Sequence, residues 1–267
     1  MVLEKIIKLD WVSQKPRFAF LLGLVYSLVG IISAKIIFPK STGMMSVAFT
    51  SILLIPTLSS LLQAEENKEI REKKFSIMAL LKDNKDTFVV YLFIFLGVFA
   101  SFTFVSLVLP ASLAQNVLEP QLSVAGLAGS AFNVQAFETI LMNNLLVLIV
   151  CLTLSLAYGA GSILFISWNA AVWGSIFGFI ARQSAMATGK NPFLYFGITI
   201  LPALPHIITE AASYFTAAIG GGVVSNAVSR EKLFSKKFYH VLTDALLIVL
   251  LGFILVVIAA AVESRLL

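Results

Sequence analysis

Long uncharged runs of apolar residues alternate along this chain with short stretches that hold most of its charged residues. A helix needs about 20 mainly apolar residues to cross the hydrocarbon core of a membrane, and several of these runs reach that length. The pattern therefore predicts an all-α, polytopic transmembrane helix bundle with about seven crossings. The expected crossings cover residues 18–38, 44–62, 87–109, 139–166, 170–181, 206–228 and 239–262.

One apolar stretch, residues 192–228, is too long for a single crossing. It contains about 37 residues, which would extend roughly 55 Å as one helix, against a hydrocarbon core of about 30 Å. Proline removes a backbone donor and kinks or breaks a helix. We therefore expect Pro202 and Pro205 to break this helix, with a short segment before them and a crossing from about His206 after them.

The segments outside these crossings differ in charge. Residues 1–15 place apolar side chains at helical spacing beside lysines, which is typical of a helix in the headgroup plane; a disordered tail is the alternative. The second crossing is expected to continue into water through the charged residues 63–86. Residues 110–138 contain prolines and glycines but no Lys or Arg, which predicts a loop outside the cytoplasm.

The basic residues indicate an orientation. Residues 1–17 hold four Lys and Arg residues, residues 63–86 hold six and residues 230–237 hold four, whereas the opposite side of the predicted topology holds four in all. Cytoplasmic segments of membrane proteins carry an excess of Lys and Arg. The count therefore predicts a multi-pass protein of the cell membrane with its N-terminus in the cytoplasm.

Composition supports the membrane assignment and excludes other classes of protein. Hydrophobic residues make up 59% of the 267 residues and charged residues only 12%, which is too little charge for the surface of a soluble domain. The net charge of +5 is explained by topology and lipid headgroups, so we expect no nucleic-acid partner. Cys151 is the only cysteine, so one chain contains neither a disulfide framework nor a cysteine zinc cluster.

Polar residues inside lipid are costly and are therefore the candidate functional residues. Asn143 and Asn144 lie near the outer end of the fourth expected crossing, and Asn169 lies at the inner junction of the fourth and fifth. His206 and Glu210 share a helical face and could form a hydrogen bond or bind one cation together. We expect the Asn pair, His206 and Glu210 to form an outward-facing polar cluster. The alternative is that these side chains only lock the bundle together.

Other polar patterns are weaker indications of chemistry. The chain has two histidines and no H-E-x-x-H motif, so no metal or cofactor is expected, with a carboxylate cation site as the weaker alternative. The run from Gly159 to Ser162 resembles part of the serine element of intramembrane proteases, but Ile163 follows it, and close helix packing explains the run as well. His240 and Asp244 form a second pair at the inner start of the last crossing, where a structural role accounts for them.

Two stripes of small residues predict close contacts between helices. Their members recur every four residues, which lets helix backbones approach one another. They are Ala170, Gly174 and Gly178, and Ala217, Gly221 and Ser225. The spacing leaves open whether the contacts lie within one chain or join the chains of a homo-oligomer.

Four motifs occur in a defined order along the second part of the chain. They are F-E-T-I-L-M-N-N at 137–144, W-N-A-A-V-W-G at 168–174, P-H-I-I-T-E at 205–210 and G-G-G at 220–222. Their order and spacing resemble the stage II sporulation protein M family, especially its archaeal members. The resemblance implies a family transmembrane domain over residues 87–267, preceded over residues 1–86 by the interfacial helix, a transmembrane hairpin and the charged linker.

The resemblance also carries the family's motif positions onto this sequence. These positions are Asn143, Asn144, Asn169, Gly174, His206 and Glu210, while Ile207 stands where many members have glycine. The bacterial namesake acts during spore engulfment as a membrane anchor for a complex with peptidoglycan hydrolases. Archaea lack spores and that wall polymer, so the resemblance implies the fold and the polar cluster but not the sporulation role.

Three functions are consistent with these observations. The first is a non-enzymatic membrane protein that organises membrane or cytoplasmic protein partners in the lipid bilayer. The second is a transporter or channel-like protein that binds an ion or small solute at His206 and Glu210, because Pro-interrupted helices form such sites in transporters. The third is an intramembrane hydrolase that uses His206 and Glu210 as base and acid.

Overall fold

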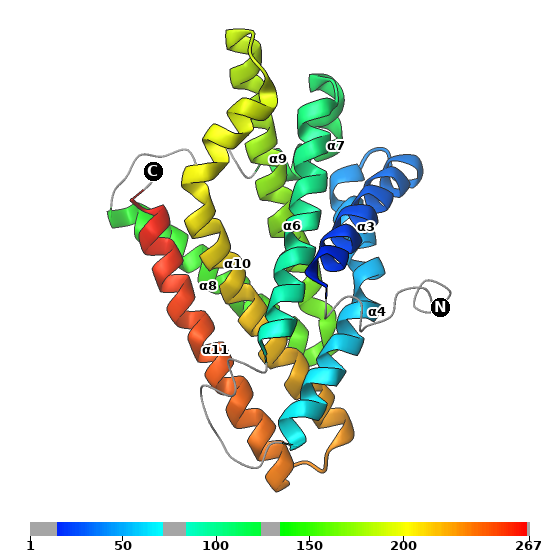
Figure 1. The fold of residues 1–267 in the computed structure, drawn as a ribbon, viewed down its shortest axis with the longest axis vertical. Coiled ribbons are helices and arrows are strands. Elements are labelled where there is room, and N and C mark those ends of the chain that lie inside the picture. The colour runs from blue at the N-terminus through cyan, green and yellow to red at the C-terminus, as the bar shows by residue number, and fades with distance from the viewer. Residues whose placement is uncertain (1–14, 72–83, 124–133, 266–267) are drawn as a thin grey trace.

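The computed structural model describes residues 15–71, 84–123 and 134–265, and within them it contains only helices and their connections. Seven of the described helices are long and apolar enough to cross a membrane, which confirms the all-α bundle (Figure 1). The expected helix over residues 1–15 and most of the linker after Arg71 lie outside the described residues. The helices are α3 (Pro16–Ile37), α4 (Thr42–Arg71), α6 (Lys85–Val108), α7 (Ala111–Ser123), α8 (Val134–Tyr158), α9 (Ile163–Thr188), α10 (Pro192–Arg230) and α11 (Lys236–Glu263), with a 3₁₀ turn, η2 (Ala160–Ser162).

Helix α10 is the central helix and packs against α4, α6, α8, α9 and α11. Its three consecutive glycines explain how several helices approach it at one level. A Cβ at Gly220 would lie 3.0 Å from the carbonyl oxygen of Ala245 on α11, and one at Gly221 would lie 2.7 Å from the Ser155 Cβ on α8. Neighbouring residues of a helix point in directions about 100° apart, so each glycine serves a different neighbour. The contact at Gly221 therefore lies within one chain.

Helices α6 and α9 also pack closely through small residues. A Cβ at Gly174 would lie 2.5 Å from the carbonyl oxygen of Phe99, so only glycine allows this approach. The Ser106 hydroxyl donates a hydrogen bond of 2.9 Å to the carbonyl oxygen of Ser175 across the same interface. The stripe that contains Gly174 is thus buried within the chain, against α6.

Residues 110–138, which we expected to form a loop, contain the helix α7 and the start of α8. Helix α7 packs against α4 and α9, and its Val117 and Leu118 are buried. Gln121 donates a 2.9 Å hydrogen bond through its Nε2 to the carbonyl oxygen of Gly43, at the start of α4. The loop prediction was wrong because these tertiary contacts stabilise a helix that its prolines and low charge did not suggest.

The fourth and fifth crossings are divided at Gly159, not between residues 166 and 170 as expected. Gly159 has a φ of +61°, a left-handed conformation that favours glycine, and η2 follows it directly. The Gly-Ser run is therefore a reversal of the chain and not the middle of a helix. Consequently Asn169 lies inside α9, in its second turn, and not at a junction between two helices.

The two prolines of α10 bend the helix without dividing it. Helix α10 runs through Pro202 and Pro205 for 39 residues, and its upper part is bent (Figure 1). A proline in a helix costs one backbone hydrogen bond, which packing against neighbouring helices can offset. Because the helix begins at Pro192, Glu210 lies about 27 Å along it. The site predicted at the outer start of a crossing is therefore deep within α10.

Candidate polar site at the centre of the bundle

Glu210 is a buried carboxyl group on the central helix α10. Its side chain points to neighbouring helices rather than to lipid, and only 5% of the residue is exposed. The Tyr214 hydroxyl, one turn further along α10, donates a hydrogen bond of 2.8 Å to Glu210 Oε1. Tyr214 is itself 1% exposed, so the pair forms a buried polar unit on one face of α10.

Helix α8 contributes the asparagine pair to this unit. The Asn143 Nδ2 donates a hydrogen bond of 3.3 Å to Asn144 Oδ1. Asn144 is 3% exposed and its side chain interacts with the Glu210 carboxyl group. Among the described residues the Asn144 Nδ2 has no partner that meets the geometry of a hydrogen bond, so this interaction is electrostatic and loosely aligned. Asn144 thus lies beside Glu210 without a well-formed hydrogen bond to it, and Asn143 is exposed at the edge of the pair.

A second carboxyl group near this cluster comes from α11. Glu263, in the last turn of that helix, is half-buried and lies within electrostatic range of Glu210 and Tyr214. Two carboxylates repel each other, so Glu263 brings α11 beside the cluster without bonding it to α10. Our sequence reasoning missed Glu263 because a carboxylate at a helix end is inexpensive in the interface. The predicted topology, which puts the end of the last crossing on the same side as the asparagines, could have indicated it.

His206 points away from this cluster. Its ring makes an edge contact with Trp173 of α9, with the ring centroids 6.5 Å apart and an interplanar angle of 78°. The His206 Nδ1 is buried and has no hydrogen-bond partner among the described residues. The expected hydrogen bond between His206 and Glu210 is therefore not formed, because each side chain packs against a different neighbouring helix.

Asn169 does not join the polar cluster either. Its Nδ2 donates a hydrogen bond of 2.8 Å to the carbonyl oxygen of Phe165, one turn earlier in α9. Because this donor bonds to the backbone of its own helix, it does not link α9 to another helix. Of the five candidate residues, the structure brings together Asn143, Asn144 and Glu210.

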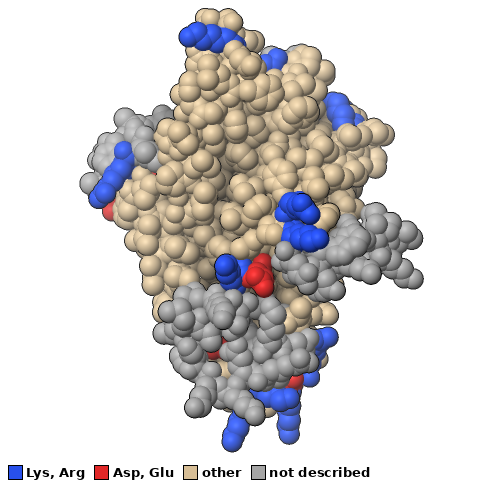
Figure 2. Space-filling model, in the orientation of Figure 1, with Lys and Arg blue, Asp and Glu red and all other residues tan. Residues whose placement is uncertain are grey.

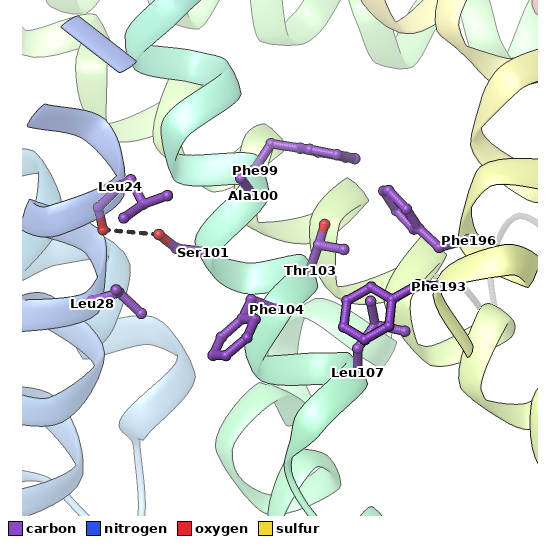
Figure 3. Close-up of a pocket in the computed structure, with 10 residues that line it drawn as sticks. All are labelled: Leu24, Leu28, Phe99, Ala100, Ser101, Thr103, Phe104, Leu107, Phe193 and Phe196. Atoms are coloured by element: carbon purple, nitrogen blue, oxygen red, sulfur yellow. Dashed lines mark hydrogen bonds between the residues drawn. The ribbon is translucent and has the colours of Figure 1, made fainter. Parts of the chain in front are cut away.

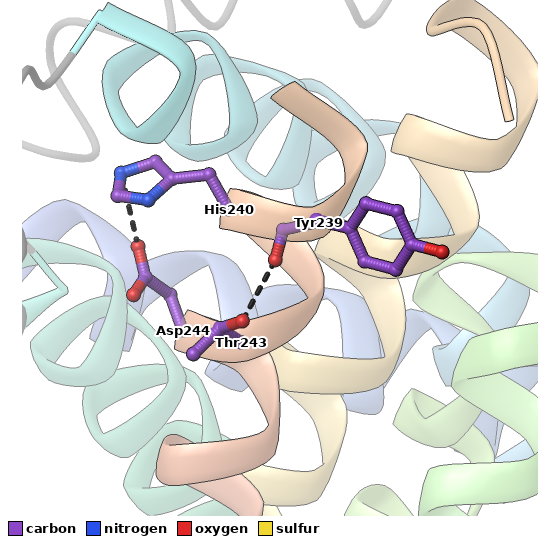
Figure 4. Close-up of polar contacts among 4 residues, drawn as sticks. All are labelled: Tyr239, His240, Thr243 and Asp244. Carbon is purple, nitrogen blue, oxygen red and sulfur yellow. Dashed lines mark hydrogen bonds and ion pairs between the residues drawn. The ribbon is translucent and has the colours of Figure 1, made fainter. Parts of the chain in front are cut away.

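The second expected pair, His240 and Asp244, lies at the opposite end of the bundle, in the first turns of α11. The His240 Nε2 and the Asp244 Oδ2 are 3.6 Å apart, and Figure 4 shows the two side chains facing each other. Asp244 is 3% exposed and lies in the third turn of α11, so its role is explained by its proximity to His240 rather than by the helix dipole. The Ser235 hydroxyl accepts a hydrogen bond from the Phe238 backbone N–H and caps the same helix end.

Fold and site together define a multi-pass helical membrane protein with a buried polar cluster on its central helix. Residues 87–266 match the family described as Stage II sporulation protein M, and the chain belongs to that family. The predicted family is thereby confirmed over two thirds of the chain. No curated protein and no solved structure matches the chain.

Proposed function

We propose that this protein is non-enzymatic and organises partner proteins in the membrane, with the polar cluster around Glu210 holding α8 and α10 together. The observation that carries the proposal is the divergence of His206 and Glu210. An acid and a base must both reach the same substrate or water. In this bundle His206 packs on α9, whereas Glu210 is satisfied by Tyr214 and faces α8.

The energetics of polar groups in lipid support the same conclusion. A polar side chain buried between membrane helices contributes to their association when it finds a partner on another helix. Asn144 and Glu210 come from different helices and are both buried. Such a contact stabilises the bundle without any need for chemistry.

A cation-binding transporter is the second candidate, and one observation favours it. The Glu210 carboxyl group has a second carboxyl group, Glu263, within electrostatic range, and carboxylate oxygens are ligands for hard cations. Carboxylates deep in a membrane bundle often mark ion or proton pathways. On this account Glu210 and Glu263 would bind the cation in place of the predicted pair of His206 and Glu210.

Proteoliposomes distinguish the two candidates. We would compare the wild type with Glu210→Gln, and with Glu138→Gln as a matched control, because Glu138 is an exposed glutamate at the outer end of α8. The organising role predicts proton and sodium flux equal to that of protein-free vesicles for all three proteins. Flux through the wild type and Glu138→Gln that is absent from folded Glu210→Gln would establish transport instead.

Partners are identified by crosslinking in the native membrane. We expect the wild type and Glu138→Gln to crosslink to the same set of membrane or cytoplasmic proteins. The amount of partner crosslinked to Glu210→Gln should fall only in proportion to the amount of folded variant, because Glu210 stabilises the fold and does not contact the partner. A chain that crosslinks to no other protein, or only to a second copy of itself as a homo-oligomer, would contradict the organising role.

We further infer that the protein lies in the cell membrane with its N-terminus in the cytoplasm and resembles the archaeal members of its family. The excess of basic residues near one end of the bundle supports this orientation. The family match, which starts at residue 87 near the start of α6, supports a division into an N-terminal addition and a family domain. The hairpin of α3 and α4 nevertheless packs directly on that domain, mainly against α6 and α10.

A further inference from the structure

A groove of about 470 Å³ lies between α3, α6 and the first turns of α10. Its walls are shown in Figure 3: Leu24 and Leu28 on α3 form one side, Phe193 and Phe196 on α10 form the other, and α6 forms the base. The Phe196 ring lies 6.2 Å from the ring of Phe99 on α6. A volume of this size falls within the usual range of ligand sites, about 300–1,000 Å³.

The lining of this groove is apolar. Ser101 is one of its two hydroxyl residues, and its Oγ already donates a 2.9 Å hydrogen bond to the carbonyl oxygen of Leu24 (Figure 3). The other lining residues include Ala100, Phe104 and Leu107, which offer only carbon atoms. The other hydroxyl residue is Thr103, whose buried Oγ1 has no hydrogen-bond partner among the described residues. A polar solute would lose its hydration here for one partner at most. The occupant must therefore be a hydrocarbon.

The groove lies at membrane depth, in the half of the bundle where α6 ends. It is lined by α6 from Phe99 to Leu107, and this helix ends at Val108. Phe104 is 53% exposed and Phe193 is 55% exposed, so the rims of the groove face the surroundings of the bundle. Figure 2 shows a broad face without charged side chains in the upper half of the molecule, as expected of a surface in contact with lipid.

The outer ends of both walls carry a basic residue. Lys35 lies seven residues after Leu28 on α3, two turns or about 10 Å further out and on the same face of the helix. Lys190 lies in the turn that precedes α10, three residues before Phe193. Both lysines are exposed. An apolar groove with basic residues beyond its outer end complements a molecule with a hydrocarbon chain and an anionic headgroup.

The exposed rims and the flanking charges favour a lipid as the occupant. The rims at Phe104 and Phe193 are exposed, and a basic residue lies beyond the outer end of each wall. A hydrocarbon chain that ends in an anionic headgroup matches both features. We propose that the groove binds one acyl chain of an anionic phospholipid, with Lys35 and Lys190 neutralising the headgroup phosphate.

The test measures lipid retention by the full chain. The protein is placed in nanodiscs with equal amounts of phosphatidylglycerol and phosphatidylcholine of identical chains, extracted gently, and its bound lipids are counted by native mass spectrometry. We expect the wild type to retain phosphatidylglycerol in preference. Lys35→Gln and Lys190→Gln should each reduce this preference about fivefold, since a basic residue near the surface contributes about 1 kcal/mol.

A second variant fills the groove. Ala100→Trp should reduce retention of both lipids, whereas Ile254→Trp, at an exposed position of α11, should not. Should Ala100→Trp fail to fold, the two lysine variants decide the question, because both side chains are exposed. Equal retention of the two lipids by the wild type overturns the headgroup assignment, and unchanged retention in folded Ala100→Trp overturns the site. Self-association that Ala100→Trp abolishes without loss of lipid would assign the groove to a second copy of the chain.

Discussion

At the scale of single residues, the polar side chains of this bundle fall into two kinds. Glu210 and Asn144 meet across two helices and contribute to the packing of the bundle. His206 and Asn169 do not reach across to that cluster: the first contacts an aromatic ring and the second bonds to its own helix. A polar residue in a membrane segment is thus a candidate functional residue, and its role depends on the helix that its side chain faces.

Tyr214→Phe is expected to destabilise the protein. The substitution removes the hydroxyl that donates to the buried Glu210 carboxyl group, which leaves an acceptor without its partner. The expected loss is about 0.6–2 kcal/mol of unfolding free energy, measured by denaturation in mixed micelles. Tyr158→Phe is the control, because Tyr158 is 76% exposed and should lose less than about 0.5 kcal/mol. Equal effects of the two substitutions would contradict the role of this hydrogen bond.

His206→Phe is expected to preserve or increase stability. Phenylalanine keeps an aromatic ring against Trp173 and removes a buried nitrogen that has no hydrogen-bond partner among the described residues. The same denaturation experiment should give a change between zero and about 1 kcal/mol in favour of the variant. A large destabilisation would show that His206 makes a polar interaction that this account omits.

At the scale of helices, close packing depends on glycines placed where a neighbour leaves no room for a side chain. Glycine destabilises a helix by about 1 kcal/mol relative to alanine, so close packing must offset that loss. Helix α10 contains both situations: Gly221 faces α8 with no space for a Cβ, whereas Gly197 has no atom within 4 Å of the position a Cβ would take.

Two alanine substitutions in α10 should therefore have opposite signs. Gly221→Ala would bring the new Cβ to 2.7 Å from the Ser155 Cβ, so we expect a loss of about 1–3 kcal/mol from overpacking. Gly197→Ala meets open space and should increase stability by up to about 1 kcal/mol through helix propensity. Changes of the same sign, measured by unfolding in micelles, would contradict the packing described for α10.

Much of this architecture was predictable from hydrophobic patterning, because the length of an apolar run directly reflects the thickness of the membrane. The central positions of the crossings are as expected. The helix α7 and the turn at Gly159 were not predictable, since one depends on tertiary contacts such as that of Gln121 and the other on a single backbone conformation. The sequence placed Asn144 and Glu210 on the same side of the membrane, but helical spacing alone could not show that His206 turns to Trp173.

At the scale of the whole molecule, the protein is a bundle around one central helix, with its polar cluster deep inside and a lipid-sized groove on its side. The orientation of this bundle decides which compartment meets each end. Four basic residues lie near the junction of α10 and α11: Arg230, Lys232, Lys236 and Lys237. By the excess of basic residues we place this junction in the cytoplasm.

Cysteine labelling in intact cells checks the orientation. In a Cys151→Ser background, a cysteine that replaces Lys232 should resist a membrane-impermeant maleimide until the cells are opened, whereas one that replaces Lys190 should react at once. Both positions are exposed, so accessibility within the protein does not differ between them. The reverse pattern would mean that the N-terminus lies outside the cytoplasm.

The central claim is that the contact between Asn144 and Glu210 joins α8 to α10 and stabilises the bundle. A double-mutant cycle of Asn144→Leu and Glu210→Leu on the unfolding free energy tests it most directly. We predict a favourable coupling of about 0.6 kcal/mol, the average found for polar contacts between membrane helices, whose maximum is about 1.7 kcal/mol. A coupling of zero, with the two substitutions strictly additive, would show that these residues do not hold the helices together.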